Sequence, residues 1–142
     1  MAHLSFNEIM QNYVNASYSL LLVIARDSLE TLKPTLNKIA PDDCGASLIL
    51  PFICLTVSAD GRFSKLEFDF INDLININTT YDEFKAFVES FYTDEWTQMI
   101  HEMVDSFSRD DKGALLNLAA SISAVDGTIT RSETAFIAKL IE

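Results

Sequence analysis

Apolar positions in the first third of the chain recur at helical spacing. The sequence SFNE at residues 5–8 has the form of a capping box, in which a Ser hydroxyl and a Glu carboxylate bond each other's backbone amides at the start of a helix. Apolar side chains then recur three or four positions apart up to Ile24. The pattern predicts one long helix that ends near Thr31, because Pro34 biases the residue before it out of helical geometry. A short further turn of helix is predicted at 35–39.

The remainder of the chain has the same helical periodicity in several shorter segments. The predicted elements are 41–58 with a kink at Pro51, a helix from Ser64, two amphipathic helices after Thr80 and Thr93, a helix from Asp110 or Asp111, and a terminal helix capped by Thr130. No segment alternates apolar and polar residues over the length of a strand. We therefore predict an all-α fold, a bundle of six or seven helices, in a single domain over residues 1–142.

The two helices after Thr80 and Thr93 carry many of the acidic residues. Their Asp and Glu side chains fall mainly on the faces opposite the apolar stripes, which predicts solvated acidic surfaces. The aromatic side chains of these helices are expected in the core. They are Phe84, Phe87, Phe91 and Trp96.

One short pattern occurs twice. The segment ADGRFSKLE at 59–67 is matched by VDGTITRSE at 125–133, and an apolar run precedes each copy. Four apolar positions after each copy are identical as well: Phe70/Phe136, Ile71/Ile137, Leu74/Leu140 and Ile75/Ile141. The sequence therefore predicts two helical hairpins, 46–77 and 112–142, related by a pseudo-twofold axis.

An Asp-Gly turn followed by a Glu is also the form of the second half of an EF-hand calcium loop. With Gly61 at position 6 of that loop, positions 1 and 3 are Thr56 and Ser58. In the second copy these positions are Ile122 and Ala124, which offer no side-chain oxygen. Because Ca²⁺ takes about six to eight oxygen ligands, we do not expect a working EF-hand.

The same residues form a complete helix boundary. The glycine can end one helix, and Ser64 with Glu67 can make the capping box that starts the next. Phe63 lies at the position that packs onto the following turn of such a helix. Thr130 and Glu133 offer the same cap in the second copy. This interpretation needs no ligand.

A third interpretation joins the two copies in one metal site. If the pseudo-twofold axis brings both loops together, four carboxylates converge on one divalent cation: Asp60, Glu67, Asp126 and Glu133. Carboxylates at such close range repel one another, so this site requires a cation or a Lys or Arg partner. The helix boundary and the shared site both remain open on the sequence alone.

The net charge and the composition of the chain indicate which classes of partner and which compartment to expect. The chain has 21 Asp and Glu against 10 Lys and Arg, a formal net charge of −11. No basic cluster of the kind that binds phosphates is present, so we expect no nucleic-acid partner. The longest apolar stretch, 46–59, contains Pro51 and is shorter than the roughly 20 residues of a membrane span. Cys44 and Cys54 form no CxxC motif, and the first residues do not resemble a signal peptide, which predicts a cytoplasmic protein with buried thiols.

No catalytic set is recognisable. His3 and His101 are the only histidines, and neither lies near a nucleophile motif, a Gly-rich phosphate loop or an HExxH zinc motif. We therefore expect no enzymatic activity, no catalytic residue and no organic cofactor. A hydrolase with paired carboxylates is the lower-ranked alternative, and it requires two carboxylates buried in one cleft.

The doubled pattern Asp-Gly-x-Phe/Ile-Ser/Thr-x-x-Glu between apolar helices resembles the TerB-like family. This family includes the tellurite-resistance protein TerB and the amino-terminal region of DjlA-type co-chaperones. The resemblance covers roughly residues 43–142 and implies an all-helical, non-enzymatic module of the bacterial cytoplasm. It further implies a link to stress response or tellurite resistance, protein partners located at the membrane, and metal binding by the four acids named above. The alternative is a plain protein–protein interaction or dimerisation module without metal.

Overall fold

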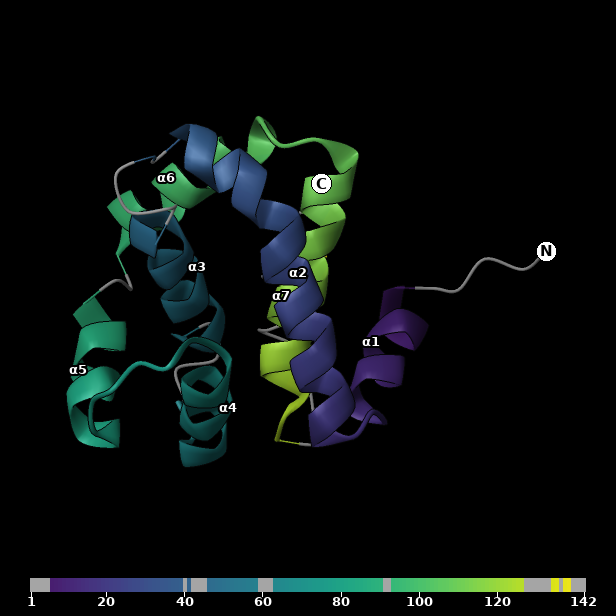
Figure 1. Ribbon diagram of the computed structural model, residues 1–142, viewed down its shortest axis with the longest axis vertical. Helices are drawn as coiled ribbons and strands as arrows, with labels where there is room; N and C mark the ends of the chain where they lie inside the picture. The colour runs from purple at the N-terminus through teal and green to yellow at the C-terminus, as the bar shows by residue number, and fades with distance from the viewer. Residues whose placement is uncertain are drawn as a thin grey trace.

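The regular structure of the described residues is entirely helical. The computed structural model describes residues 6–39, 41, 46–58, 63–90, 93–126, 134–135 and 137–138, and no strand occurs among them. The described helices are α1 (Phe6–Val14), α2 (Tyr18–Ile39), α3 (Ala46–Ser58), α4 (Lys65–Ile75), α5 (Tyr81–Ser90), α6 (Asp94–Asp105) and α7 (Arg109–Ala124), as labelled in Figure 1. Short helical pieces follow at 134–135 and 137–138. The predicted all-α class is confirmed.

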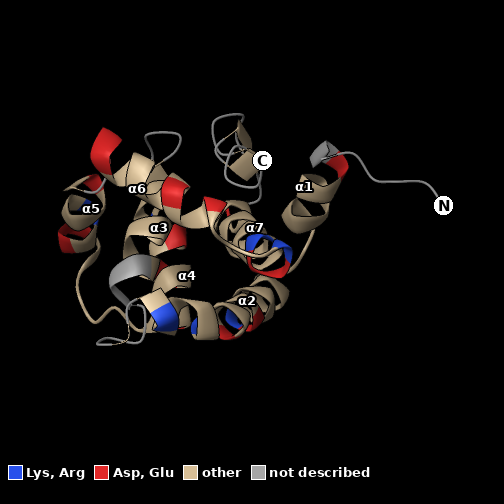
Figure 2. Cartoon of the chain, turned by 90° about the horizontal axis from the view of Figure 1, so that it is seen from above, with Lys and Arg blue, Asp and Glu red and all other residues tan. Residues whose placement is uncertain are grey.

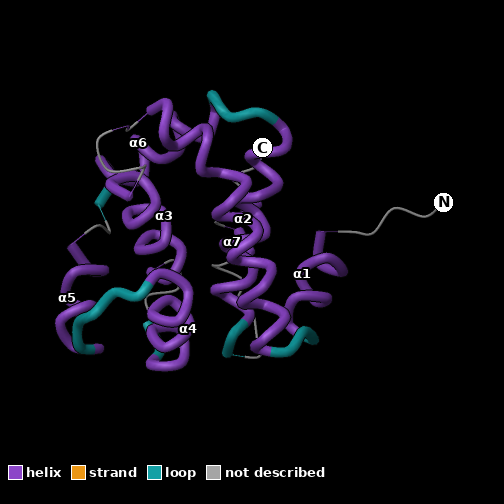
Figure 3. The backbone as a smooth tube through the Cα atoms, in the orientation of Figure 1, coloured by secondary structure: helices purple, strands orange, loops and turns teal. Residues whose placement is uncertain are grey.

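Helices α2 and α7 form the most extensive pair and lie side by side along most of their length (Figures 1 and 3). Helix α1 packs against the flank of α7. Helix α3 contacts α5, α6 and α7, so it connects the α2–α7 pair with α5 and α6, whereas α4 contacts α2 and α7 directly. None of the helices within the described residues is long and apolar enough to cross a membrane.

The core is centred on α3 and α7. Every residue from Pro51 to Ser58 is buried, as is every residue from Leu118 to Ala124. Helix α3 is apolar on all sides, which is typical of a helix enclosed by others. Along its buried stretch α7 alternates large residues with Ala and Ser, whose small side chains allow neighbouring helices to approach closely. The two most buried helices therefore end where the Asp-Gly segments begin.

The N-terminal stretch forms two helices, so the prediction of a single long one is wrong. Helix α1 ends at Val14, and α2 begins at Tyr18. Between them, Oγ of Ser17 accepts a hydrogen bond from the amide of Leu20 at 3.2 Å and caps the second helix. The apolar stripe continues across the break, which is why hydrophobic periodicity alone did not reveal it.

Helix α2 continues through Pro34 to Ile39, whereas the sequence predicts an end near Thr31. Proline lacks the amide hydrogen that a helix interior uses. Leu32 and Leu36 lie on either side of the proline, and both are buried in the core. Burial of these two side chains offsets the missing backbone bond, because each is worth about 1.5–3 kcal/mol.

The start of α7 is set by Ser108, not by Asp110 or Asp111 as predicted. Oγ of Ser108 accepts a hydrogen bond from the amide of Asp111 at 3.2 Å. The carboxylate of Asp111 is buried and accepts a hydrogen bond of 2.6 Å from the Thr35 hydroxyl on α2. Asp111 therefore joins α7 to α2 instead of capping the helix.

Gly113 lies in the second turn of α7. A Cβ atom added at this position would meet no atom within 4 Å. A glycine within a helix costs about 0.5–1 kcal/mol relative to alanine. Local packing does not require a glycine here.

The acidic residues predicted at the surface of α5 and α6 are solvent-exposed, and Figure 2 marks in red the Asp and Glu positions along these helices. Phe84 is buried as expected, but Phe87 is 39% exposed and does not belong to the core. Phe91 lies outside the described residues. The exposed carboxylates are Asp82, Glu83, Glu89, Asp94, Glu95, Glu102 and Asp105.

Candidate functional site

The first Asp-Gly segment leads into α4 through a complete capping box. Oγ of Ser64 accepts a hydrogen bond from the amide of Glu67 at 3.0 Å. Oε1 of Glu67 accepts one from the amide of Ser64, also at 3.0 Å. These bonds satisfy amide groups that have no partner within the first turn of a helix. The predicted capping box is confirmed at this copy, whereas Gly61, the predicted end of the preceding helix, lies outside the described residues.

An aromatic cluster fixes the chain just before this cap. The ring of Phe63 packs edge-on against Phe68 with centroids 6.4 Å apart, which is the predicted contact between the residue before the cap and the next turn. Its ring also stacks on Tyr81 at 5.5 Å and contacts Phe84 at 5.6 Å. The Tyr81 hydroxyl donates to the carbonyl of Phe63. Helix α5 therefore fixes the position of Phe63, the residue directly before Ser64.

Ser64 also binds the second Asp-Gly segment. Its hydroxyl donates to the carboxylate of Asp126, with Oγ 2.9 and 3.0 Å from the two carboxylate oxygens. Asp126 lies two residues beyond the end of α7, and α4 and α7 pack against each other. A hydrogen bond from the Ser64 hydroxyl thus joins two residues that are 62 positions apart in the chain. We call Ser64, Glu67 and Asp126 together the Ser64 junction.

Two of the four predicted metal ligands, Glu67 and Asp126, belong to this junction. Glu67 is 3% exposed and is engaged in the cap, whereas Asp126 is open to solvent. The other two predicted ligands, Asp60 and Glu133, lie outside the described residues. Within the described part of the chain, no three His, Cys, Asp or Glu side chains come close enough together to hold a metal ion.

The start of α4 provides an electrostatic reason for two carboxylates to meet. The N-terminus of a helix carries a partial positive charge, and a nearby carboxylate gains about 0.3–1 kcal/mol from it. Glu67 lies in the first turn of α4, and Asp126 contacts the cap residue Ser64. The amides and hydroxyl of the cap therefore partly offset the repulsion between these two carboxylates.

The positions that an EF-hand would need for its first ligands are unsuitable. Thr56 and Ser58 are buried in α3, and their hydroxyls donate to the backbone carbonyls of Phe52 at 2.9 Å and Cys54 at 2.7 Å. Their corresponding positions in the second copy lie within buried helix α7. These side chains belong to helices and not to a loop.

Cys54 is a buried thiol in the middle of α3. Burial raises its pKa to about 12, so the thiol is neutral at physiological pH. The predicted burial of this thiol is confirmed. Cys44 lies outside the described residues.

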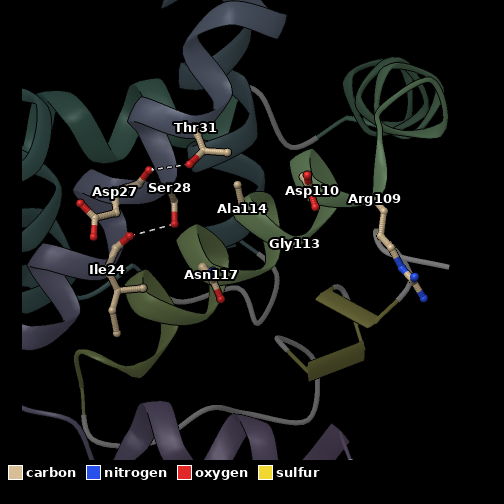
Figure 4. A pocket seen from close by; sticks show the side chains of 9 residues that line it. All are labelled: Ile24, Asp27, Ser28, Thr31, Arg109, Asp110, Gly113, Ala114 and Asn117. Carbon is tan, nitrogen blue, oxygen red and sulfur yellow. Dashed lines mark hydrogen bonds between the residues drawn. The ribbon is translucent and has the colours of Figure 1, made fainter.

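Two adjoining pockets on α7 were not predicted. One, of about 400 Å³, lies between α2 and α7, and Figure 4 shows the side chains that line it. The other, of about 390 Å³, is lined by Phe107, Arg109, Lys112, Gly113 and Leu116. Arg109 and Gly113 line both pockets. The glycine in a helix interior was the one sequence signal that could have indicated them.

None of the known protein-family models matches the chain, and no curated protein and no solved structure matches it. The resemblance to the TerB-like family therefore rests on the doubled motif alone.

Proposed function

We propose that this chain is a non-enzymatic, TerB-like helical interaction module of the bacterial cytoplasm, associated with tellurite resistance or stress response. In this proposal the two Asp-Gly segments form one junction that binds a divalent cation. The observation that supports it is the hydrogen bond between the Ser64 hydroxyl and the Asp126 carboxylate, at 2.9 and 3.0 Å. It brings a residue of the first segment and a residue of the second to the same point.

The proposal includes a pseudo-twofold relation between the segments 46–77 and 112–142. Helices α3 and α7 would be equivalent, and the cap at Ser64 would correspond to a cap at Thr130. Three features are consistent with this relation. Both helices are buried, both end at an Asp-Gly pair, and Ile137 is fully buried like its counterpart Ile71.

The proposed cation would be held chiefly by carboxylates. Asp126 is exposed, and its one described hydrogen-bond partner is the Ser64 hydroxyl, which leaves lone pairs on both oxygens for a hard cation. Asp60, Glu67 and Glu133 are the other three ligands of the proposed site. Oxygen ligands of this kind favour Ca²⁺, Mg²⁺ or Mn²⁺ over metals that prefer nitrogen and sulfur ligands.

A protein partner, which the family resemblance would place at the membrane, is the other part of the proposal. The alternative is a plain interaction or dimerisation module that binds no metal. The same hydrogen bond is compatible with this alternative, because the Ser64 hydroxyl and the start of α4 already stabilise the Asp126 carboxylate without a metal.

A hydrolase with paired carboxylates finds little support. Two carboxylates are buried among the described residues, Glu67 and Asp111. Asp111 lies in the first turn of α7 and bonds to Thr35, whereas Glu67 belongs to the junction beyond the other end of that helix. A helix of this length separates its ends by roughly 24 Å, so these carboxylates do not share a cleft.

Calorimetric titration with Ca²⁺, Mg²⁺, Mn²⁺ and Zn²⁺ tests the cation site. We expect saturable heat with at least one of the hard cations and a higher melting temperature at millimolar metal, because a ligand that binds only the folded state stabilises it. Asp126→Asn should weaken binding at least about ten-fold, since it removes a charged ligand.

The matched control is Asp105→Asn, which neutralises an exposed carboxylate at the end of α6, outside the junction. It should leave the affinity unchanged. Absence of heat for all four metals, together with an unchanged melting temperature, would rule out the cation site and leave the metal-free module.

A further inference from the structure

The second pocket on α7 combines an apolar wall with two cationic side chains. Phe107 is buried and Leu116 is half-buried, and both line the pocket of about 390 Å³. Arg109 and Lys112 lie on the same part of α7. Neither forms an ion pair with any residue that the structure describes. The pocket therefore presents positive charge beside apolar surface on a chain whose net charge is −11.

Asp110 and Asp111, the acids of the same turn of α7, form no ion pair with these cations. Asp111 is buried and engaged by Thr35, and Asp110 lines the pocket on the α2 side. In Figure 4, Arg109 extends away from Asp27, the acid that α2 contributes to that first pocket. The two pockets thus differ in charge, because Asp27 and Asp110 line the first together with Arg109, whereas the second is lined by Arg109 and Lys112 and by no carboxylate.

Gly113 keeps the floor of both pockets open. A Cβ atom here would touch nothing within 4 Å, so neither close packing nor a neighbouring helix excludes a side chain. Any larger residue would nevertheless project into the space that the two pockets share. The glycine is less favourable in a helix than alanine, and it leaves this shared space free of a side chain.

We propose that this α7 pocket binds an acidic amphipathic segment of a partner protein. A carboxylate of the partner would pair with Arg109 and Lys112, and an adjacent apolar side chain would lie over Gly113 between Phe107 and Leu116. This inference rests on the protein partner in the proposed function, and it specifies the chemical character of the partner segment that binds. It is independent of cation binding, because the pocket and Asp126 lie at opposite ends of α7.

Charge complementarity selects this kind of partner. Nucleic acid and anionic membrane extend far beyond a pocket of this size, so the remaining charge of the protein would repel them. Salt screens charges that lie further apart than the Debye length, about 8 Å at physiological ionic strength. A short segment with one or two carboxylates therefore interacts mainly with the charged groups of the pocket itself. A second copy of this chain carries the full net charge of −11 and is disfavoured for the same reason.

Nuclear magnetic resonance on the ¹⁵N-labelled full chain, without divalent cations, tests the proposal. The probe is the tetrapeptide acetyl-Glu-Phe-Leu-Glu-amide, and its uncharged match is acetyl-Gln-Phe-Leu-Gln-amide. We expect the acidic peptide to shift the amide signals of Gly113 and Leu116 in a saturable manner. The uncharged peptide should bind at least about ten-fold more weakly, because charge-assisted hydrogen bonds to Arg and Lys are lost.

Two variants locate the site. Lys112→Gln should weaken binding of the acidic peptide about ten-fold or more, and Gly113→Leu should abolish it by filling the pocket. Gly113→Leu is expected to remain folded, since nothing obstructs its Cβ atom, and a thermal melt checks this. Lys85→Gln, at an exposed lysine of α5 outside the pocket, is the control and should bind like the unmodified chain.

Three results would overturn the proposal. They are the absence of saturable shifts at millimolar peptide, equal binding of both peptides, and movement of the Gly113 signal when the protein alone is diluted. The last result would identify a second copy as the occupant. None of them affects the calorimetric test at Asp126, so failure of this pocket is distinguishable from failure of the cation site.

Discussion

Phe63→Ala is expected to lower the free energy of unfolding by about 3–5 kcal/mol, the range for removing a buried aromatic ring. The residue directly precedes the cap of α4, yet its ring is enclosed by Phe68, Tyr81 and Phe84. Deletion of the ring leaves a cavity between α4 and α5. It also removes the ring contacts that hold Phe63 beside Ser64. Denaturant unfolding monitored by circular dichroism measures the change.

Phe87→Ala is the matched control for this substitution. Phe87 is an aromatic residue of the same region, but it is 39% exposed and stacks on Phe84 from outside. Its loss should cost about 1 kcal/mol. Equal effects of the two substitutions would mean that Phe63 is not enclosed as described and that the segment before α4 is not fixed by α5.

Leu32→Ala is expected to cost about 2–5 kcal/mol. Leu32 is fully buried, two residues before Pro34, in the part of α2 that the sequence did not predict as helix. If α2 ended near Thr31, the side chain would lie at a helix end and its truncation would cost much less. The unfolding free energy therefore tests whether α2 runs through the proline.

Leu20→Ala in the same helix is the control. Leu20 is 50% exposed, and its contribution to the cap of α2 is made by its backbone amide, which alanine retains. The expected change is within about 0.5 kcal/mol of zero. A small effect at Leu32 together with a small effect at Leu20 would contradict the continuous helix.

Hydrophobic periodicity was sufficient to predict the fold class, since each described helix except α1 and α2 coincides closely with a predicted segment. It failed in the first third of the chain for two separate reasons. The apolar stripe passes unbroken across Ser17, where only a side-chain cap marks the boundary. At Pro34 local preference predicted a stop, but burial of Leu32 and Leu36 outweighs it.

The candidate site could be predicted only where its interactions are local. The capping box of Ser64 and Glu67 and the contact between Phe63 and Phe68 follow from spacings of three to five residues, and the structure confirms them. The bond from Ser64 to Asp126 spans 62 positions. The sequence left open whether the two segments converge, and it contained no information on which atoms would meet.

The pockets on α7 were missed for a similar reason. Arg109 and Lys112 are ordinary surface residues in the sequence, and their significance depends on Phe107, on Leu116 and on the space over Gly113. Pockets form where side chains from different positions leave space between them, and the hydrophobic periodicity of the sequence does not predict such spaces. A glycine in the interior of a predicted helix was the available signal.

A double-mutant cycle of Ser64→Ala and Asp126→Ala tests most directly whether the two Asp-Gly segments meet at one hydroxyl. Ser64→Ala alone should cost about 1 kcal/mol through loss of the cap. The account predicts that the unfolding free energies of the two substitutions are coupled by about 0.5–1.5 kcal/mol, because each single change already removes their shared hydrogen bond. Ser64→Ala combined with Asp105→Ala serves as the reference pair and should be additive. Additivity of Ser64→Ala and Asp126→Ala within about 0.3 kcal/mol would contradict the junction.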